Sequence, residues 1–74
     1  MKIHYDRLND QAYVDITEEH DLYQTKGRLS FDEHGEVVGI GLEHLSLGVT
    51  LRGVPAAHKP EIARRLRKRG VAVR

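Results

Sequence analysis

The sequence predicts an α+β domain in which a small antiparallel sheet of about four strands is followed by a C-terminal amphipathic helix. The first observation is that apolar and polar residues alternate over about the first two thirds of the 74 residues, as they do in half-buried strands. The second is that the spacing then becomes helical, because Ile62, Ala63 and Leu66 fall within one arc of a helix. A chain of this length forms one domain with a small core.

The first two expected strands are separated by a polar turn. Ile3 and Tyr5 share one face of the first strand, and residues 12, 14 and 16 form the apolar face of the second. Residues 6–10 between them are rich in Asp and Asn, whose side chains hydrogen-bond the backbone in tight turns.

The third and fourth expected strands are joined by the clearest turn in the sequence. The third covers residues 22–32, after a charged connection at residues 18–21, and Gly27 within it marks a bulge or a bend. Residues 32–35 begin with Asp and end with Gly, which suits a type I turn. The fourth strand covers residues 37–42. Short links between all four strands predict an antiparallel meander with one apolar face.

The helix is expected at residues 60–69 and covers the apolar face of the sheet. Pro60 suits the first helical turn, and Glu61 complements the positive end of the helix dipole. Gly70 fits the position just past the helix, where a left-handed conformation is common. A helix of about ten residues is not stable alone, so it must dock on its own sheet or on a partner.

The chain is therefore divided into four parts within one domain, residues 1–74. Residues 1–46 form the sheet, 47–59 a connection, 60–69 the basic helix and 70–74 a short tail that returns as an edge strand. The connection is expected to be held to the core by its apolar side chains, which are Leu47, Val49, Leu51 and Val54.

The charge of the chain is unevenly distributed. Up to Leu51, ten acidic residues stand against four basic ones, whereas from Arg52 onward eight basic residues stand against Glu61 alone. The net charge of +1 conceals this separation. An acidic body with a basic helix bears on partners and encounter rates rather than on the fold.

Composition excludes several classes of protein. The chain has no cysteine, so it forms neither a disulfide nor a thiolate metal site. No apolar stretch approaches the roughly 20 residues that span a bilayer, and the start lacks a signal-peptide pattern, so a cytoplasmic location is expected. Aromatic residues are few, which disfavours binding through base stacking.

Two stretches of the strand region carry a family pattern. They are Ile3-His4-Tyr5-Asp6 followed by Asp10-Gln11-Ala12-Tyr13-Val14, and then Phe31-Asp32-Glu33-His34-Gly35-Glu36-Val37-Val38-Gly39-Ile40. In this order they resemble the YuzE-like family of small bacterial proteins of unknown function, over about residues 3–46. The resemblance implies no cofactor and no reaction. Some members resemble small partners encoded beside toxin-like proteins of the ribonuclease type, which implies an antitoxin-like or accessory role.

The five histidines, at positions 4, 20, 34, 44 and 58, do not show the spacing of a metal site. No pair follows the His-x-x-x-His pattern, and zinc sites need three or four converging ligands. His4 and His44 meet only if their strands are neighbours. We therefore expect surface histidines and no metal.

Catalytic residues are not predicted. Asp6 and Asp10 lie in a polar turn, where carboxylates are expected to stay ionised and exposed, with no shifted pKa. Tyr13 points to the face opposite the core, where it is an expected interface anchor if that face is open. The chain is thus expected to be no enzyme and to hold no cofactor.

The cluster of cations on the helix is the main candidate site. It consists of Arg64, Arg65, Arg67, Lys68 and Arg69. Three interpretations stay open: a solvated helix face, a surface for an acidic protein or a second copy, and a contact with nucleic-acid phosphates. Nucleic-acid binding would be non-specific and strongly salt-dependent, because no helix residue is placed to read bases.

The leading hypothesis is a non-enzymatic interaction module, an antitoxin-like or regulatory partner of another small bacterial protein. The alternative is a non-specific nucleic-acid-binding accessory protein that acts through the basic helix. Homodimerisation is also expected, through the uncovered sheet or by exchange of the tail.

Overall fold

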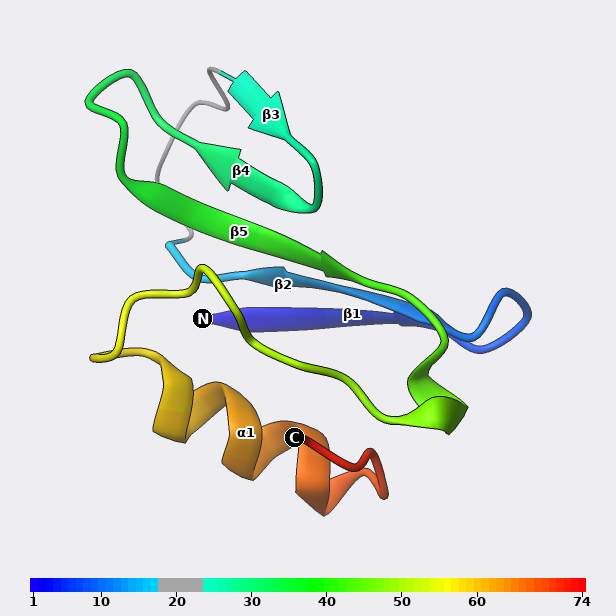
Figure 1. Ribbon diagram of the computed structural model, residues 1–74. Coiled ribbons are helices and arrows are strands. Elements are labelled where there is room, and N and C mark those ends of the chain that lie inside the picture. The colour runs from blue at the N-terminus through cyan, green and yellow to red at the C-terminus, as the bar shows by residue number, and fades with distance from the viewer. Residues whose placement is uncertain (18–23) are drawn as a thin grey trace.

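The computed structural model describes residues 1–17 and 24–74, and within these residues it contains a five-stranded antiparallel sheet and one α-helix (Figure 1). In chain order the elements are β1 (Lys2–Asp6), β2 (Gln11–Asp15), β3 (Gln24–Lys26), β4 (Leu29–Phe31), β5 (Val37–Leu42), the 3-10 helix η1 (Leu45–Leu47) and α1 (Lys59–Lys68). The α+β prediction is confirmed, with five strands in place of about four. The connection expected at residues 18–21 and the strand start expected at Leu22 lie outside the described residues.

The strands lie in the order β1-β2-β5-β4-β3, so β5 rather than β3 pairs with β2. β1 and β2 form one hairpin, and β3, β4 and β5 follow one another as antiparallel neighbours. The order thus differs from that of a single meander. The physical reason is burial, because β5 is the longest and most buried strand and the central position gives it a neighbour on each side.

The predicted third strand is divided at Gly27 into β3 and β4. Lys26 pairs with Leu29, which leaves Gly27 and Arg28 as a two-residue turn. Gly27 has a φ of 60°, the positive value that such hairpin turns require at their first central position. The expected bend is therefore a complete reversal of the chain, and it creates the fifth strand.

The turn predicted at residues 32–35 is confirmed. The amide of Gly35 donates to the carbonyl of Asp32 at 3.1 Å, and Gly35 has a φ of 78°. The Asp32 carboxylate accepts the amides of His34 at 2.8 Å and Glu36 at 2.9 Å. The side chain thus satisfies backbone donors that the turn leaves without partners.

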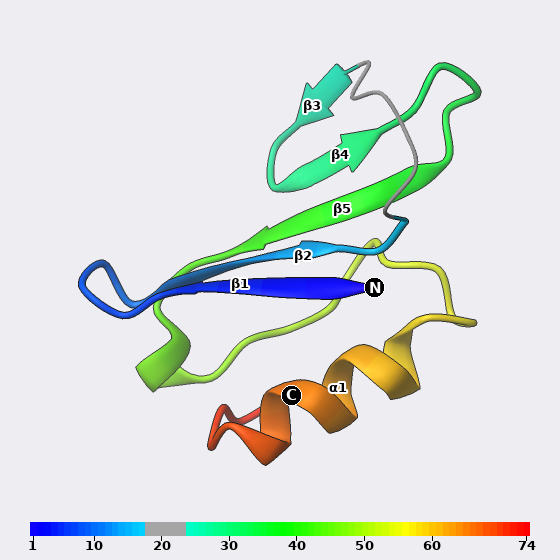
Figure 2. The same cartoon turned by 180° about the vertical axis from the view of Figure 1, so that it is seen from behind.

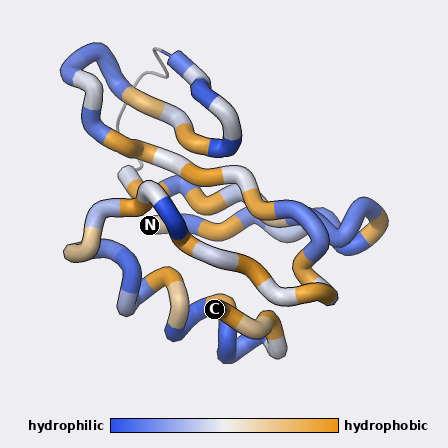
Figure 3. Tube along the Cα trace, in the orientation of Figure 1, coloured by the Kyte–Doolittle hydropathy of each residue, from blue (hydrophilic) through white to orange (hydrophobic). Residues whose placement is uncertain are grey.

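One face of the sheet is covered by α1, and the two layers share a single core (Figure 1, Figure 2). Val14 and Ile40 from the sheet and Ile62 and Leu66 from the helix have no exposed surface. Burying a side chain of this size contributes about 1.5–3 kcal/mol. Figure 3 shows the alternation of hydrophobic and hydrophilic residues along the strands that produces this face.

The connection between β5 and α1 is held to the core as predicted, except at Leu47. Val49, Leu51 and Val54 are buried, whereas the Leu47 side chain is 74% exposed. The prediction was wrong there because residues 45–47 form the short helix η1, which packs Leu45 toward the core and turns Leu47 outward. Val73 forms an isolated parallel bridge with Val49, which is the short return expected of the tail.

Helix α1 begins one residue earlier and ends one residue earlier than predicted, at Lys59 and Lys68. Pro60 lies in its first turn, and Gly70 follows it with a φ of 83°. The amide of Gly70 donates to Arg67 O at 2.9 Å and the amide of Val71 to Leu66 O at 3.0 Å, which together form a Schellman motif. In the described part of the chain, no helix is long and apolar enough to cross a membrane.

Candidate interaction surface

The five predicted cations do not form one surface, because α1 presents them on two sides. Four of them line a groove of about 600 Å³ between the helix and the edge strand β1. The groove residues from α1 and its C-cap are Arg64, Arg65, Lys68 and Arg69, and those from the N-terminal end of the chain are Met1, Lys2, Ile3 and Tyr5. We call this surface the β1 flank.

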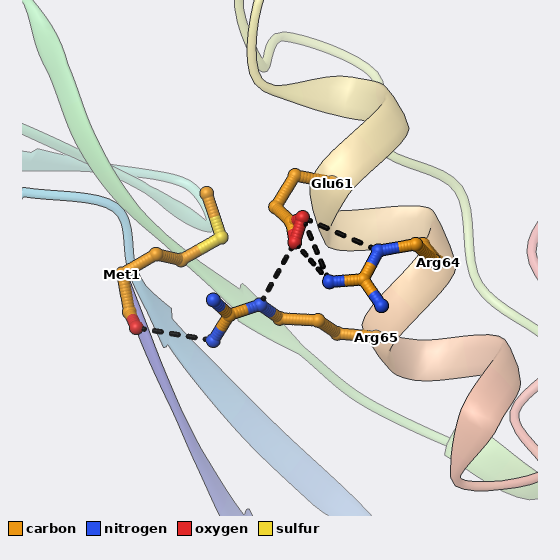
Figure 4. A network of polar contacts seen from close by, with 4 residues as sticks. All are labelled: Met1, Glu61, Arg64 and Arg65. Atoms are coloured by element: carbon orange, nitrogen blue, oxygen red, sulfur yellow. Dashed lines mark hydrogen bonds and ion pairs between the residues drawn. The ribbon is translucent and has the colours of Figure 1, made fainter.

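Glu61 organises the first turn of the β1 flank (Figure 4). Arg64 donates Nε to Glu61 Oε2 at 3.3 Å and Nη2 to both carboxylate oxygens. Arg65 donates Nε to Glu61 Oε1 at 3.3 Å and reaches across to the carbonyl of Met1 at 3.2 Å. Arg65 therefore joins the helix to the start of β1 and fixes the width of the groove at that end.

The contacts of this network favour the charged forms of Glu61 and Arg64. The guanidinium of Arg64, and then that of Arg65, hold the pKa of Glu61 below its ordinary value. The same contact raises the pKa of Arg64. Since one carboxylate faces two guanidinium groups, a positive charge remains.

The other end of the β1 flank is formed by Lys68 and Arg69. The guanidinium carbon of Arg69 lies 4.7 Å from the centre of the Tyr5 ring, a cation–π contact that again joins the helix to β1. Lys68 also lines the groove, and the described residues offer its ammonium group no hydrogen bond or ion pair. Lys68 is thus the cation best placed to meet an external anion.

Arg67 lies on the other side of α1, in a second basic hollow of about 550 Å³. Its cations are Arg52, Lys59, Arg67 and Arg74, and we call this surface the C-terminal flank. Arg67 donates to Val73 O at 3.2 Å, and Arg74 donates to Gly48 O at 3.3 Å. These two side chains therefore also hold the tail of the chain in place.

Tyr13 lies on the open face of the sheet, away from both flanks. Its hydroxyl donates to Ser30 Oγ at 3.1 Å, and its ring crosses Gly39, where a Cβ on the glycine would collide with the hydroxyl oxygen. Ser30 is only 4% exposed. The tyrosine expected to be an anchor is thus held along the sheet, beside an open hollow of about 930 Å³ that it helps to line.

The turn carboxylates Asp6 and Asp10 depart from expectation in one respect. Asp6 accepts the Asn9 side-chain amide at 2.8 Å, and Asp10 accepts the Ser46 hydroxyl at 2.6 Å. These hydrogen bonds lower the pKa of each carboxyl, so the prediction of no shift was wrong. Both groups are therefore structural anions, and Asp10 ties the β1–β2 turn to η1.

The sheet does not bring His4 and His44 together. β2 lies between β1, which carries His4, and β5, which precedes His44, so these two residues are not cross-strand neighbours. Within residues 1–17 and 24–74, no group of three or more His, Cys, Asp or Glu is arranged to hold a metal ion. His20 lies outside the described residues.

Sequence reasoning found the cations of the β1 flank but missed its second wall. Ile3 and Tyr5, which share one face of β1, are half-buried and pack against the core, and they also line the groove. The order of strands in a sheet depends on long-range pairing, so no local signal marked β1 as an edge.

Comparison of the chain with protein-family models, with curated proteins and with solved structures found no match. The resemblance of residues 3–46 to the YuzE-like family therefore stays a prediction.

Proposed function

We propose that this protein is a non-enzymatic interaction module that binds an acidic protein partner through the β1 flank. The observation that supports this proposal is the groove in which four cations of α1 face the strand β1. We propose that the protein acts in the cytoplasm as an antitoxin-like or regulatory partner of another small bacterial protein.

The titratable groups support binding rather than acid–base chemistry. The pKa values of Asp6, Asp10, Glu61 and Arg64 are shifted, and each of these four shifts favours the charged form. A general acid or base works best with a pKa near neutrality, and these shifts move away from it. Fixed charges of this kind suit electrostatic steering of a partner.

The proposal is tested by co-expression with the product of the neighbouring gene. The double variant Arg64→Gln/Lys68→Gln removes two cations from the β1 flank, and Arg52→Gln/Lys59→Gln removes two from the C-terminal flank. We expect affinity to fall by about tenfold in the first and by less than about twofold in the second, since surface charges act locally at moderate salt. A failure to form a complex, or equal losses in the two variants, would count against the proposal.

Non-specific nucleic-acid binding is the alternative that the same variants distinguish. Phosphates respond to charge alone, so both double variants should then lower the salt dependence of DNA or RNA binding to the same extent. Retention of nucleic acid with this symmetric loss, and no acidic protein partner, would replace our proposal with this one.

Self-association is proposed separately, through the open face of the sheet. That face is not covered by α1, and charges of both signs line its hollow, namely Asp6, Glu43 and Arg28. A second copy docked there leaves both flanks of α1 accessible. Light scattering at low and moderate salt tests this arrangement, which predicts a dimer that the Tyr13→Ala variant weakens; a monomer at both salt concentrations contradicts it.

A further inference from the structure

We infer that the β1 flank binds its acidic partner by strand addition, in which an extended segment pairs with the outer edge of β1 while alternate carboxylates meet the cations of α1. This inference rests on the proposed function and specifies how the partner is recognised. The occupant is an extended acidic segment of a different protein.

The backbone of β1 is available on one side. β1 is one of the two edge strands of the sheet, and it is paired along residues 2–6 with β2. No described strand pairs with its other side, so an edge of about 17 Å remains for a partner at about 3.3 Å per residue. The opposite edge of the sheet, β3, has three residues that are all exposed and lines neither basic flank.

The side chains of β1 indicate which partner residues face α1. Ile3 and Tyr5 are half-buried and line the groove, whereas His4 and Asp6 are exposed and do not line it. Lys2 also lines the groove, although its side chain is exposed. An added strand alternates in the same way, so every second side chain enters the groove. There it meets the apolar surfaces of Ile3 and Tyr5 and, beyond them, the cations of the helix. Glu at alternate positions suits both surfaces, because its methylene groups pack on Ile3 and Tyr5 while its carboxylate meets the cations.

A second copy of this chain is a poorer occupant, although β1 has a self-complementary register. Antiparallel pairing centred on His4 would place Lys2 of each copy opposite Asp6 of the other. The two-fold axis of such a pair is perpendicular to the sheet, so both helices lie on the same face. The cations of one β1 flank would then face those of its mate. This repulsion disfavours self-pairing and favours an anionic strand.

The same charges explain how the edge is protected when no partner is bound. Exposed edges of natural sheets are commonly guarded by charged side chains, especially Lys, which discourage pairing with neutral strands. Lys2 on the strand and Lys68 beside it serve this purpose. An acidic segment, in contrast, is attracted by these positive charges.

The test uses the full chain and a blocked peptide in which Glu and Val alternate. Two further peptides carry N-methyl groups on the amides of either the Glu or the Val residues, because successive amides of a strand point to opposite edges. We expect the unmodified peptide to bind, one methylated isomer to bind about equally, and the other to bind at least about tenfold more weakly. The reason is that each blocked main-chain hydrogen bond costs several-fold in affinity.

The outcomes separate this inference from the proposed function. Equal binding of both methylated isomers, or equal losses in both, overturns strand addition, and the proposed function stands if Arg64→Gln/Lys68→Gln still weakens binding. Absence of binding by the peptide and by the co-expressed partner overturns both. A dimer whose β1 amides are protected from exchange without peptide also overturns the inference, since it shows that a second copy occupies the edge.

Discussion

The β1 flank and the C-terminal flank of α1 are both basic, with five and four cations respectively, yet they differ in the backbone beside them. The β1 flank adjoins a strand whose outer edge no described strand pairs with. The C-terminal flank adjoins residues 49–51 and 73–74, whose backbone is already joined by the Val49–Val73 bridge. In that flank, Arg67 and Arg74 also bind carbonyls of their own chain.

Charge alone therefore does not define a binding surface in this protein. The two basic regions differ in the hydrogen-bonding capacity of the adjacent main chain. A ligand that recognises only charge should bind both flanks, whereas a ligand that also pairs with a strand edge should bind the β1 flank alone. Substitutions that alter the contacts around the two flanks test whether they differ in this way.

The largest effect is expected from Leu66→Ala, which removes the side chain that holds both flanks against the sheet. Leu66 has no exposed surface and lies in the core with Ile40 and Ile62. Such a truncation costs about 2–5 kcal/mol in the free energy of unfolding, through lost burial and the cavity left behind. Leu47→Ala is the matched control, because Leu47 is exposed and its loss should cost less than about 0.5 kcal/mol. Urea denaturation measures both values, and similar losses in the two variants would contradict this packing.

A smaller effect is expected from Gly39→Ala, which perturbs the open face while leaving both flanks unchanged. The new Cβ would collide with the Tyr13 hydroxyl and lie 2.7 Å from the ring carbon that bears it. The ring must therefore move and lose its bond to Ser30, at a cost of about 1–3 kcal/mol. Thermal unfolding should show that Tyr13→Ala in the same chain relieves part of this loss. If the effects of the two substitutions on stability are additive, the close packing of Tyr13 on Gly39 does not cause the loss.

The contact of Arg69 with Tyr5 is expected to contribute about 0.5–1 kcal/mol, as cation–π pairs do at exposed sites. A double-mutant cycle with Arg69→Gln and Tyr5→Leu isolates this coupling from the other effects of each change. Because the contact closes one end of the β1 flank, its loss should weaken peptide binding more than Arg67→Gln does. A coupling energy of zero would show that Arg69 does not help to join the helix to β1.

The smallest effect is expected from Glu61→Gln, which removes the anion between Arg64 and Arg65. The folded-state pKa of Glu61 is lowered, so the unfolded chain binds more protons and stability rises with pH. The contribution is present above the ordinary carboxyl pKa of about 4.3 and is lost as pH falls through the lower folded value. Thermal unfolding of the native chain and the variant should therefore converge in acid and separate toward neutral pH. Convergence at neutral pH instead would show that the ion pairs do not stabilise the fold.

Local features of the fold could be predicted from the sequence because they depend on a few adjacent residues. The turn at residues 32–35 follows from its Asp and Gly, and the end of α1 follows from Gly70. The alternation at residues 37–42 likewise identified the buried face, since strand side chains alternate whatever their neighbours are.

Long-range features could not be predicted in the same way. The pairing of β5 with β2 depends on how the whole chain buries its most apolar strand. The helical period placed Arg64 and Arg67 on one polar surface, but the edge strand and the tail divide that surface into two flanks. The cations of the candidate site were therefore predicted from the sequence. The edge strand β1, which distinguishes one flank from the other, was not.

Amide hydrogen exchange of the full chain, with and without the alternating Glu–Val peptide, tests strand addition most directly. Strand addition to the β1 flank predicts that amides in β1 gain protection, while those in β3 and those beside the C-terminal flank do not change. Unchanged exchange in β1 while the peptide is bound, or equal protection of β1 and β3, would contradict it.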